Sequence, residues 1–115
     1  MSLVAIIGAG EIGGAVARAL ASRSRVDAIR LIDDKESVAA GKALDLMQAG
    51  PISGSATRIE GAADLGAAAG ASAIVLADPG SGAEWPSETA LSLLHRLKTG
   101  GHLDRSVLIC AGATH

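Results

Sequence analysis

The sequence contains no tyrosine and no phenylalanine, and Trp85 is its only aromatic residue. A hydrophobic core must therefore be built from aliphatic side chains, and the aromatic surfaces on which single-stranded nucleic acids stack are excluded. Runs of Lys and Arg are also absent, and ten basic residues stand against twelve acidic ones for a net charge of −2. Because phosphate backbones select clustered basic side chains, nucleic acid is not expected as a partner.

Long apolar runs and paired cysteines are missing too. No apolar stretch approaches the roughly 20 residues that cross a bilayer, so no membrane partner is expected. The opening residues MSLVAIIGAG lack the basic start and cleavage site of a signal peptide, and Cys110 is the single cysteine. A cytoplasmic location follows as the expectation, and 115 residues are expected to form one domain.

Short apolar runs alternate with longer helical stretches along the chain. The expected strands are Leu3 to Ile7, Ala28 to Ile32, Thr57 to Glu60, Ala73 to Ala77 and Ser106 to Cys110. This alternation is typical of βαβ units. It predicts an α/β fold with a doubly wound, Rossmann-type parallel sheet in the strand order 3-2-1-4-5 and helices on both faces.

The expected helices are marked by their apolar spacing. The first carries a stripe formed by Ile12, Val16 and Leu20 with Ala15 and Ala19 beside it. The second spans Ser37 to Ala49 and ends before Gly50-Pro51. A last helix begins near Pro86 and stops at Gly100, and the segment GAADLGAAAGASA is predicted to be a crossover with some helix in it.

Three glycines follow the first strand and precede the first helix. Gly8, Gly10 and Gly13 form the pattern G-x-G-x-x-G in the context that a dinucleotide-binding turn requires. The first glycine permits a tight turn, the second allows a pyrophosphate to approach the backbone, and the third lets the helix lie close to the strand. The positive end of the helix dipole then favours the phosphates.

Two acidic residues follow the second strand. Asp33 comes 20 residues after Gly13, where a carboxylate can accept both ribose hydroxyls of an adenosine. Asp33 and Asp34 would also repel a 2′-phosphate, which favours NAD over NADP, although neighbouring Lys35 argues the other way. The alternative is that the glycines form only a tight turn and the two acids cap a loop.

Glu11 begins the first helix beside the predicted pyrophosphate. Its carboxylate could interact with the helix dipole, compete with the phosphates, or point into solvent, and the last of these is the expectation.

The runs AIIGAGEIGGAVARALA, LIDD and GKALDLMQAGPISGSATRIEGAADL resemble, in order and spacing, the N-terminal half of the malate and lactate dehydrogenases. The resemblance covers residues 3 to 80 and implies an NAD-binding domain that a substrate domain completes, the two together transferring hydride between NAD and a 2-hydroxy acid. The residues that match the family's dinucleotide site are Gly8, Gly10, Ile12, Gly13, Asp33 and, at the end of the fourth strand, Gly80.

The chain also departs from that family. No Arg or Lys occurs from residue 59 to residue 95, where the family carries an arginine that polarises the substrate carbonyl. Ala111-Gly112 stands where the family places an Asn-Pro pair. The sixth strand and the substrate domain are expected to be missing, so this chain alone is expected to be inactive. A non-catalytic nucleotide-binding module is the alternative function.

Other candidate residues have simpler interpretations. Among His95, His102 and His115 no pair has the i, i+4 spacing of a metal site, and Cys110 is expected to be a small buried apolar residue. Association is predicted through the Ser37 to Ala49 helix. In the family that helix packs on a partner subunit, and Val38, Leu44, Leu46 and Met47 are expected to exceed what one sheet face covers.

Overall fold

The computed structural model describes residues 3–22, 26–49, 57–77, 95 and 107–110. The strands are β1 (Leu3–Ile7), β2 (Ala28–Ile32), β3 (Arg58–Ala62), β4 (Ala73–Leu76) and β5 (Val107–Cys110). The helices with assigned bounds are α1 (Glu11–Ser22), α2 (Glu36–Ala49) and the 3-10 helix η2 (Leu65–Ala68).

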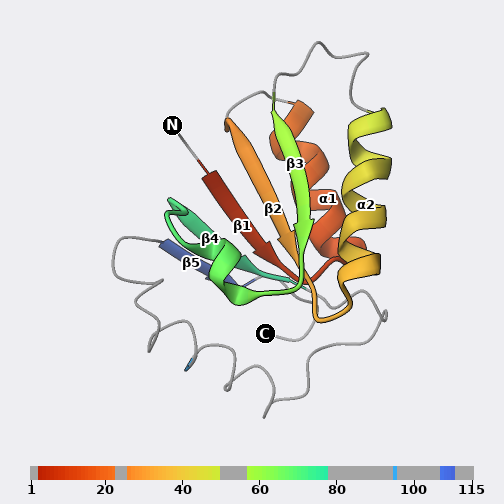
Figure 1. Ribbon diagram of the computed structural model, residues 1–115. Coiled ribbons are helices and arrows are strands. Elements are labelled where there is room, and N and C mark those ends of the chain that lie inside the picture. The colour runs from red at the N-terminus through yellow and green to blue at the C-terminus, as the bar shows by residue number, and fades with distance from the viewer. Residues whose placement is uncertain (1–2, 23–25, 50–56, 78–94, 96–106, 111–115) are drawn as a thin grey trace.

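The five strands form one parallel sheet in the order β3-β2-β1-β4-β5, which confirms the predicted topology (Figure 1). The chain proceeds outward from β1 to β2 and β3, then crosses back to place β4 on the other side of β1. The register aligns the last residue of β1, Ile7, with Ile32 of β2 and Leu76 of β4. The carboxyl ends of these three strands therefore lie level, and the strand order reverses between β1 and β4.

One face of the sheet is covered by α1 and α2 (Figure 1). Strand residues such as Ile6, Ile29 and Leu31 are fully buried there against Ala17 of α1 and Leu46 of α2. The side chains of this layer are aliphatic, as the shortage of aromatic residues requires.

The predicted stripe of α1 is only partly correct. Ile12, Val16 and Leu20 pack on the sheet and are half-buried, but Ala15 and Ala19 are exposed. Four residues separate Gly13 from Ala17, so both lie on the buried side of the helix, and Ala15 falls on the opposite side.

Strand β3 and helix α2 approach one another at Gly61. A Cβ atom built on Gly61 would lie 2.5 Å from the carbonyl carbon of Ala39 and from the nitrogen of Ala40. No side chain fits between these two backbones. The small residues Gly61 and Ala39 therefore set how closely α2 lies over the end of the sheet.

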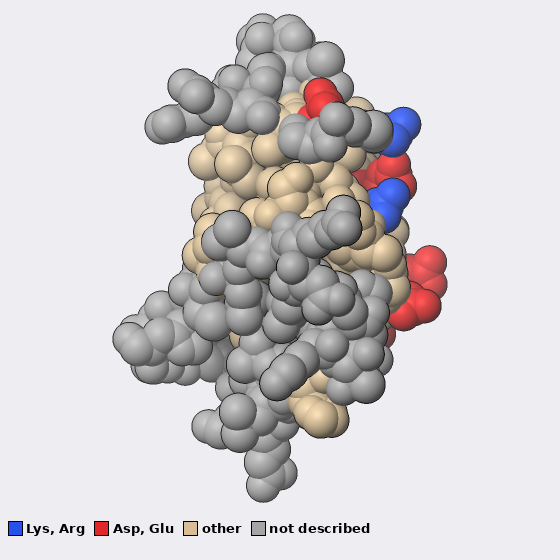
Figure 2. All heavy atoms as spheres, turned by 90° about the vertical axis from the view of Figure 1, so that its left-hand side faces the viewer, with Lys and Arg blue, Asp and Glu red and all other residues tan. Residues whose placement is uncertain are grey.

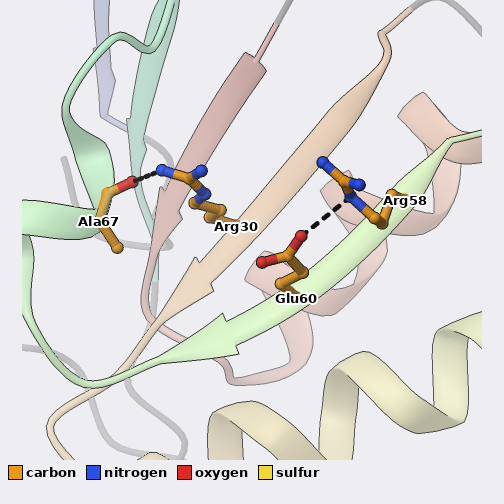
Figure 3. Close-up of polar contacts among 4 residues, drawn as sticks. All are labelled: Arg30, Arg58, Glu60 and Ala67. Atoms are coloured by element: carbon orange, nitrogen blue, oxygen red, sulfur yellow. Dashed lines mark hydrogen bonds and ion pairs between the residues drawn. The ribbon is translucent and has the colours of Figure 1, made fainter.

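The opposite face carries η2 and two polar contacts (Figure 3). Arg30 of β2 donates a hydrogen bond from Nη1 to the carbonyl oxygen of Ala67 at 2.9 Å, which fixes η2 over the sheet. Arg58 and Glu60 of β3 form an ion pair of 2.9 Å on the same face. Because both side chains are about half-exposed, this pair contributes little to stability.

The predicted boundaries are close to those observed. The first two strands match, the third lies one to two residues further along than Thr57 to Glu60, and β4 ends one residue before the predicted Ala77. The last strand agrees with the prediction over Val107–Cys110, and Ser106 lies outside the described residues. Helix α2 begins one residue before Ser37. The predicted helix from Pro86 to Gly100 lies outside the described residues except for His95, which is helical and exposed.

Candidate functional site

The glycine turn joins β1 to α1 at the point where the strand order reverses. Gly8 has φ +112°, a left-handed value that favours glycine, and its N–H donates to the carbonyl oxygen of Ile32 at 2.7 Å. A Cβ atom on Gly13 would collide with the carbonyl oxygen of Gly8 and would lie 3.3 Å from Cγ2 of Ile6. The structural roles predicted for Gly8 and Gly13 are therefore confirmed: a tight turn, and a helix that rests directly on it.

Asp33 follows β2 and faces this turn. It is only 2% exposed. Its Oδ2 accepts a hydrogen bond from the N–H of Ala9 at 3.0 Å, and its Oδ1 accepts one from the N–H of Lys35 at 3.2 Å. The carboxylate thus lies beside the glycine turn, as the sequence predicts for the acid of a dinucleotide site.

Asp34 is exposed next to Asp33. A hydrogen bond with the Asp33 side chain raises the pKa of Asp34, and partial desolvation and the charge of Asp33 act in the same direction. Lys35 opposes this shift. When both carboxyl groups are ionised, the end of β2 carries two adjacent negative charges, which disfavour a further negative group there.

The other predicted site residues have varied surroundings. Gly10 is buried in the turn, and its carbonyl oxygen accepts the N–H of Gly14 at 2.9 Å. Glu11 is exposed at the start of α1, in agreement with the solvent-facing expectation, and Ile12 is half-buried against the core. Gly80 lies outside the described residues.

Two features of the site were not predicted. The backbone N–H of Ala9 bonds to Asp33, and an unremarkable alanine gives no side-chain signal for that role. The side chain of Lys42 runs from α2 over the first turns of α1, where its Cε lies 3.3 Å from the position of a Cβ on Gly14. The sequence gives no indication that this lysine spans the gap between two helices.

The described surface carries no broad basic area on the face shown in Figure 2. There the basic side chains alternate with acidic ones along one margin. Among the described residues, no helix is both long and apolar enough to cross a membrane.

The family model that matches this chain describes the NAD-binding domain of lactate/malate dehydrogenases, and the match covers residues 2–96. The chain belongs to this family. The match confirms the resemblance found in the sequence. The chain is the NAD-binding domain of a malate/lactate dehydrogenase-like protein, and its cofactor is NAD. The alternative of a non-catalytic module is not favoured.

Relatives in the lactate/malate dehydrogenase family are much longer than this chain. A malate dehydrogenase from Roseiflexus sp. is 45% identical over 73 residues, which are 64% of this chain and 23% of that protein. A malate dehydrogenase from Thioalkalivibrio sulfidiphilus is 32% identical over 105 residues, which are 87% of this chain and 34% of that protein. The chain therefore spans about a quarter to a third of these relatives.

Solved structures of the lactate/malate dehydrogenase family share the fold. The malate dehydrogenase from Aeropyrum pernix superposes with a TM-score of 0.80 at 22% identity, over 96% of this chain and 36% of that one. The lactate dehydrogenase from Cryptosporidium parvum, complexed with lactic acid and NAD, gives a TM-score of 0.71 at 24% identity, over 95% and 36% of the two chains. At these identities the likeness establishes the Rossmann-type fold.

Proposed function

We propose that this chain binds NAD across the carboxyl edge of its sheet, at the glycine turn between β1 and α1. The observation that carries the proposal is the position of that turn: it lies where the strand order reverses, with the start of α1 behind it and the Asp33 carboxylate bonded against it. The pyrophosphate lies against Gly10, which has no Cβ atom to obstruct its approach to the backbone. The dipole of α1 stabilises the phosphate charge.

The adenosine ribose lies at Asp33 and Asp34. The N–H groups of Ala9 and Lys35 hold the Asp33 carboxylate in place beside the turn. The paired acids also disfavour a 2′-phosphate by charge repulsion. The cofactor is therefore NAD in preference to NADP.

Titration with NADH, followed by fluorescence or calorimetry, tests this function. The wild-type chain should saturate, Gly10→Val should not, and Gly41→Ala should bind like wild type because nothing lies within 4 Å of a Cβ at Gly41. Absence of saturation up to millimolar NADH would overturn the proposal. Equal affinity for NADPH would overturn the role given to the two acids.

The complete protein is proposed to transfer hydride between NAD and a 2-hydroxy acid, as in the lactate/malate dehydrogenase family. This chain is proposed to be the NAD-binding domain of that enzyme and to have no such activity alone. The absence of Arg and Lys from residue 59 to residue 95 and the Ala111-Gly112 pair support this. NADH formation from malate or lactate, retained on repurification and lost in Gly10→Val, would contradict it.

The parent gene provides a second test of the complete enzyme. A coding sequence that continues for a further ~150 to 200 residues, the size of a second domain, with an arginine and a histidine for catalysis, supports the dehydrogenase. A coding sequence without such a segment supports a non-catalytic nucleotide-binding module. The location is proposed to be the cytoplasm, which suits a chain with one cysteine.

A homodimer through α2 is part of the same proposal. Leu44 and Met47 are 58% and 42% exposed on this helix, and exposed Gly41 lies one turn before Leu44. Leu46, however, is 5% exposed and belongs to the core, and Val38 is half-buried, so the apolar surface is smaller than the sequence predicted. A helix of this kind with a glycine on its apolar side suits close contact with a second copy.

Light scattering after size exclusion tests this association. The proposed result is a dimer at micromolar concentration that dissociates in the double variant Leu44→Glu, Met47→Glu. A monomer at high concentration would refute the association. A dimer that survives the double substitution would refute α2 as its site.

A further inference from the structure

The N–H of Ala9 is hydrogen-bonded to the side chain of a residue on the neighbouring strand. Ala9 and Asp33 are each 2% exposed, and the distance from the Ala9 nitrogen to Asp33 Oδ2 is 3.0 Å. At that burial, water cannot replace the carboxylate as the acceptor for Ala9. A buried N–H without an acceptor is costly, so this bond matters to the turn.

The geometry of the turn explains why a side chain is needed. The hydrogen bonding between β1 and β2 continues through Gly8, whose N–H donates to the carbonyl oxygen of Ile32 at 2.7 Å. At Gly8 the φ of +112° takes the chain away from the path of β2. The next N–H, that of Ala9, bonds to the Asp33 carboxylate, and so a side chain joins this part of the turn to the end of β2.

Asp33 is itself held on two further sides. Its N–H donates to the carbonyl oxygen of Ala62 at the end of β3, at 3.0 Å. Its Oδ1 accepts the N–H of Lys35 in the β2–α2 connection at 3.2 Å. One residue thus connects the ends of β1, β2 and β3, and its carboxylate is fixed before any ligand is present.

We propose that Asp33 is a positioning residue for the glycine turn, holding Ala9 and therefore the turn in the geometry that receives a pyrophosphate. The inference rests on the proposed NAD-binding function and goes beyond ribose contact. Asp33 supports a part of the nucleotide that it does not touch. Loss of the Asp33 side chain should therefore also weaken the binding of ligands that have no ribose hydroxyls.

The first test needs no ligand. In ¹⁵N-labelled protein, Asp33→Ala should raise the hydrogen-exchange rate of the Ala9 amide by about tenfold or more, the effect expected for loss of a hydrogen bond to a charged group. Amides in β4 should change less. Asp64→Ala is the matched control, since Asp64 accepts a similar bond from the N–H of Gly66 at 2.9 Å but at an exposed site. Unchanged exchange at Ala9 in a folded Asp33→Ala variant would overturn the proposal.

A measurement on the wild-type chain covers the case in which Asp33→Ala does not fold. The amide proton shift of Ala9 should follow the ionisation of the Asp33 carboxyl, read from its side-chain carbon, in a pH titration of the ligand-free chain. An Ala9 shift that does not follow this ionisation would contradict the bond and the proposal.

The second test separates positioning from ribose contact. ADP and 2′,3′-dideoxy-ADP are titrated into wild type, Asp33→Ala and the control Asp64→Ala, since alanine removes the acceptor of the Ala9 N–H whereas asparagine would keep one. If Asp33 positions the turn, Asp33→Ala lowers the affinity for both nucleotides severalfold, while Asp64→Ala binds both like wild type. If Asp33 contacts only the ribose, the dideoxy nucleotide binds equally to wild type and Asp33→Ala, and the proposal fails. If wild type binds neither nucleotide, the proposed function fails, and the exchange result alone decides the role of Asp33.

Discussion

Two glycines of this domain, Gly13 and Gly61, each lie so close to the backbone of another segment that no side chain fits. A Cβ on Gly13 would collide with the carbonyl oxygen of Gly8, and a Cβ on Gly61 would lie 2.5 Å from the carbonyl carbon of Ala39. Gly13 holds α1 on the glycine turn, where the cofactor is proposed to bind. Gly61 holds β3 against α2, and β2 lies between β3 and the strand that leads into that turn.

The two contacts differ in how readily the sequence reveals them. Gly13 belongs to a spaced motif with a known physical purpose, whereas Gly61 stands alone in a short strand, where a glycine indicates only a bulge or some close approach. Equal steric constraint can therefore serve ligand binding in one place and packing in another. Substitutions at the two glycines separate the role in ligand binding from the role in packing.

The largest effect is expected at Gly13. Gly13→Ala should lower the free energy of unfolding by about 3 kcal/mol or more, at the upper end for overpacking, because the new methyl group meets a fixed carbonyl. It should also abolish NADH binding. Denaturant unfolding measures the first effect and titration the second.

Gly14→Ala is the matched control for Gly13→Ala. Its Cβ would meet only the flexible side chain of Lys42, at 3.3 Å. The Gly14→Ala variant should therefore have nearly the stability of the wild-type chain. A folded Gly13→Ala that binds NADH normally would contradict the assigned contact.

Gly61→Ala is expected to destabilise less, by about 1 to 3 kcal/mol. Strand β3 stands at one end of the strand order, so it can shift outward to relieve the clash. NADH affinity should be retained at temperatures where the variant is folded. Thermal unfolding checks the stability, with Gly66→Ala as the control, since its Cβ would make only ordinary contact at 3.4 Å with Asp64.

Gly41→Ala is expected to increase the free energy of unfolding instead of lowering it. Gly41 lies within α2 with nothing inside 4 Å of its Cβ position, so alanine should stabilise the monomer by up to about 1 kcal/mol through helix propensity. If α2 forms the proposed dimer, the same change should weaken association. Unfolding of dilute protein and light scattering of concentrated protein measure the two effects. Stronger association in the variant would argue against close packing at Gly41.

The smallest expected effect concerns Asp34. Because contact with Asp33 raises the pKa of Asp34 above its ordinary value of 3.8, the contact stabilises the fold below pH 3.8, and this stabilisation is lost as pH rises through the raised pKa. At neutral pH the two charged carboxylates repel each other. Asp34→Asn should therefore raise the melting temperature slightly at pH 7, and the gain should shrink on acidification. A gain that increases toward low pH would contradict the assigned sign.

Much of the fold could be predicted from the sequence because local and tertiary requirements agree there. The aliphatic residues of β1 are buried on both faces of a parallel sheet, so β1 is a continuous apolar segment, and β2 is interrupted only by half-buried Arg30. Strand β3, with exposed Arg58 and Glu60, lies at one end of the sheet and carries a weaker signal, which explains its shifted boundaries. Leu46 looked available for a partner only because sequence does not show how far α2 extends over β3.

The candidate site was predictable in its residue types but not in its connections. Spacing identified the three glycines and Asp33, since each type has one physical use at that place. The bond from Ala9 to Asp33 joins residues 24 apart in sequence through a backbone group, and no residue pattern encodes it. Only the aligned ends of β1 and β2 bring the two together.

Chemical-shift mapping with NADH tests the central claim most directly. If NAD binds at the glycine turn, adding NADH to ¹⁵N-labelled protein should shift the amides from Gly8 to Gly13 and those of Asp33 to Lys35 most strongly. Amides of β3 and of the exposed side of α2 should move little, and Gly10→Val should remove the response. Shifts that centre on β3 or on α2 while the turn stays unperturbed would contradict the account.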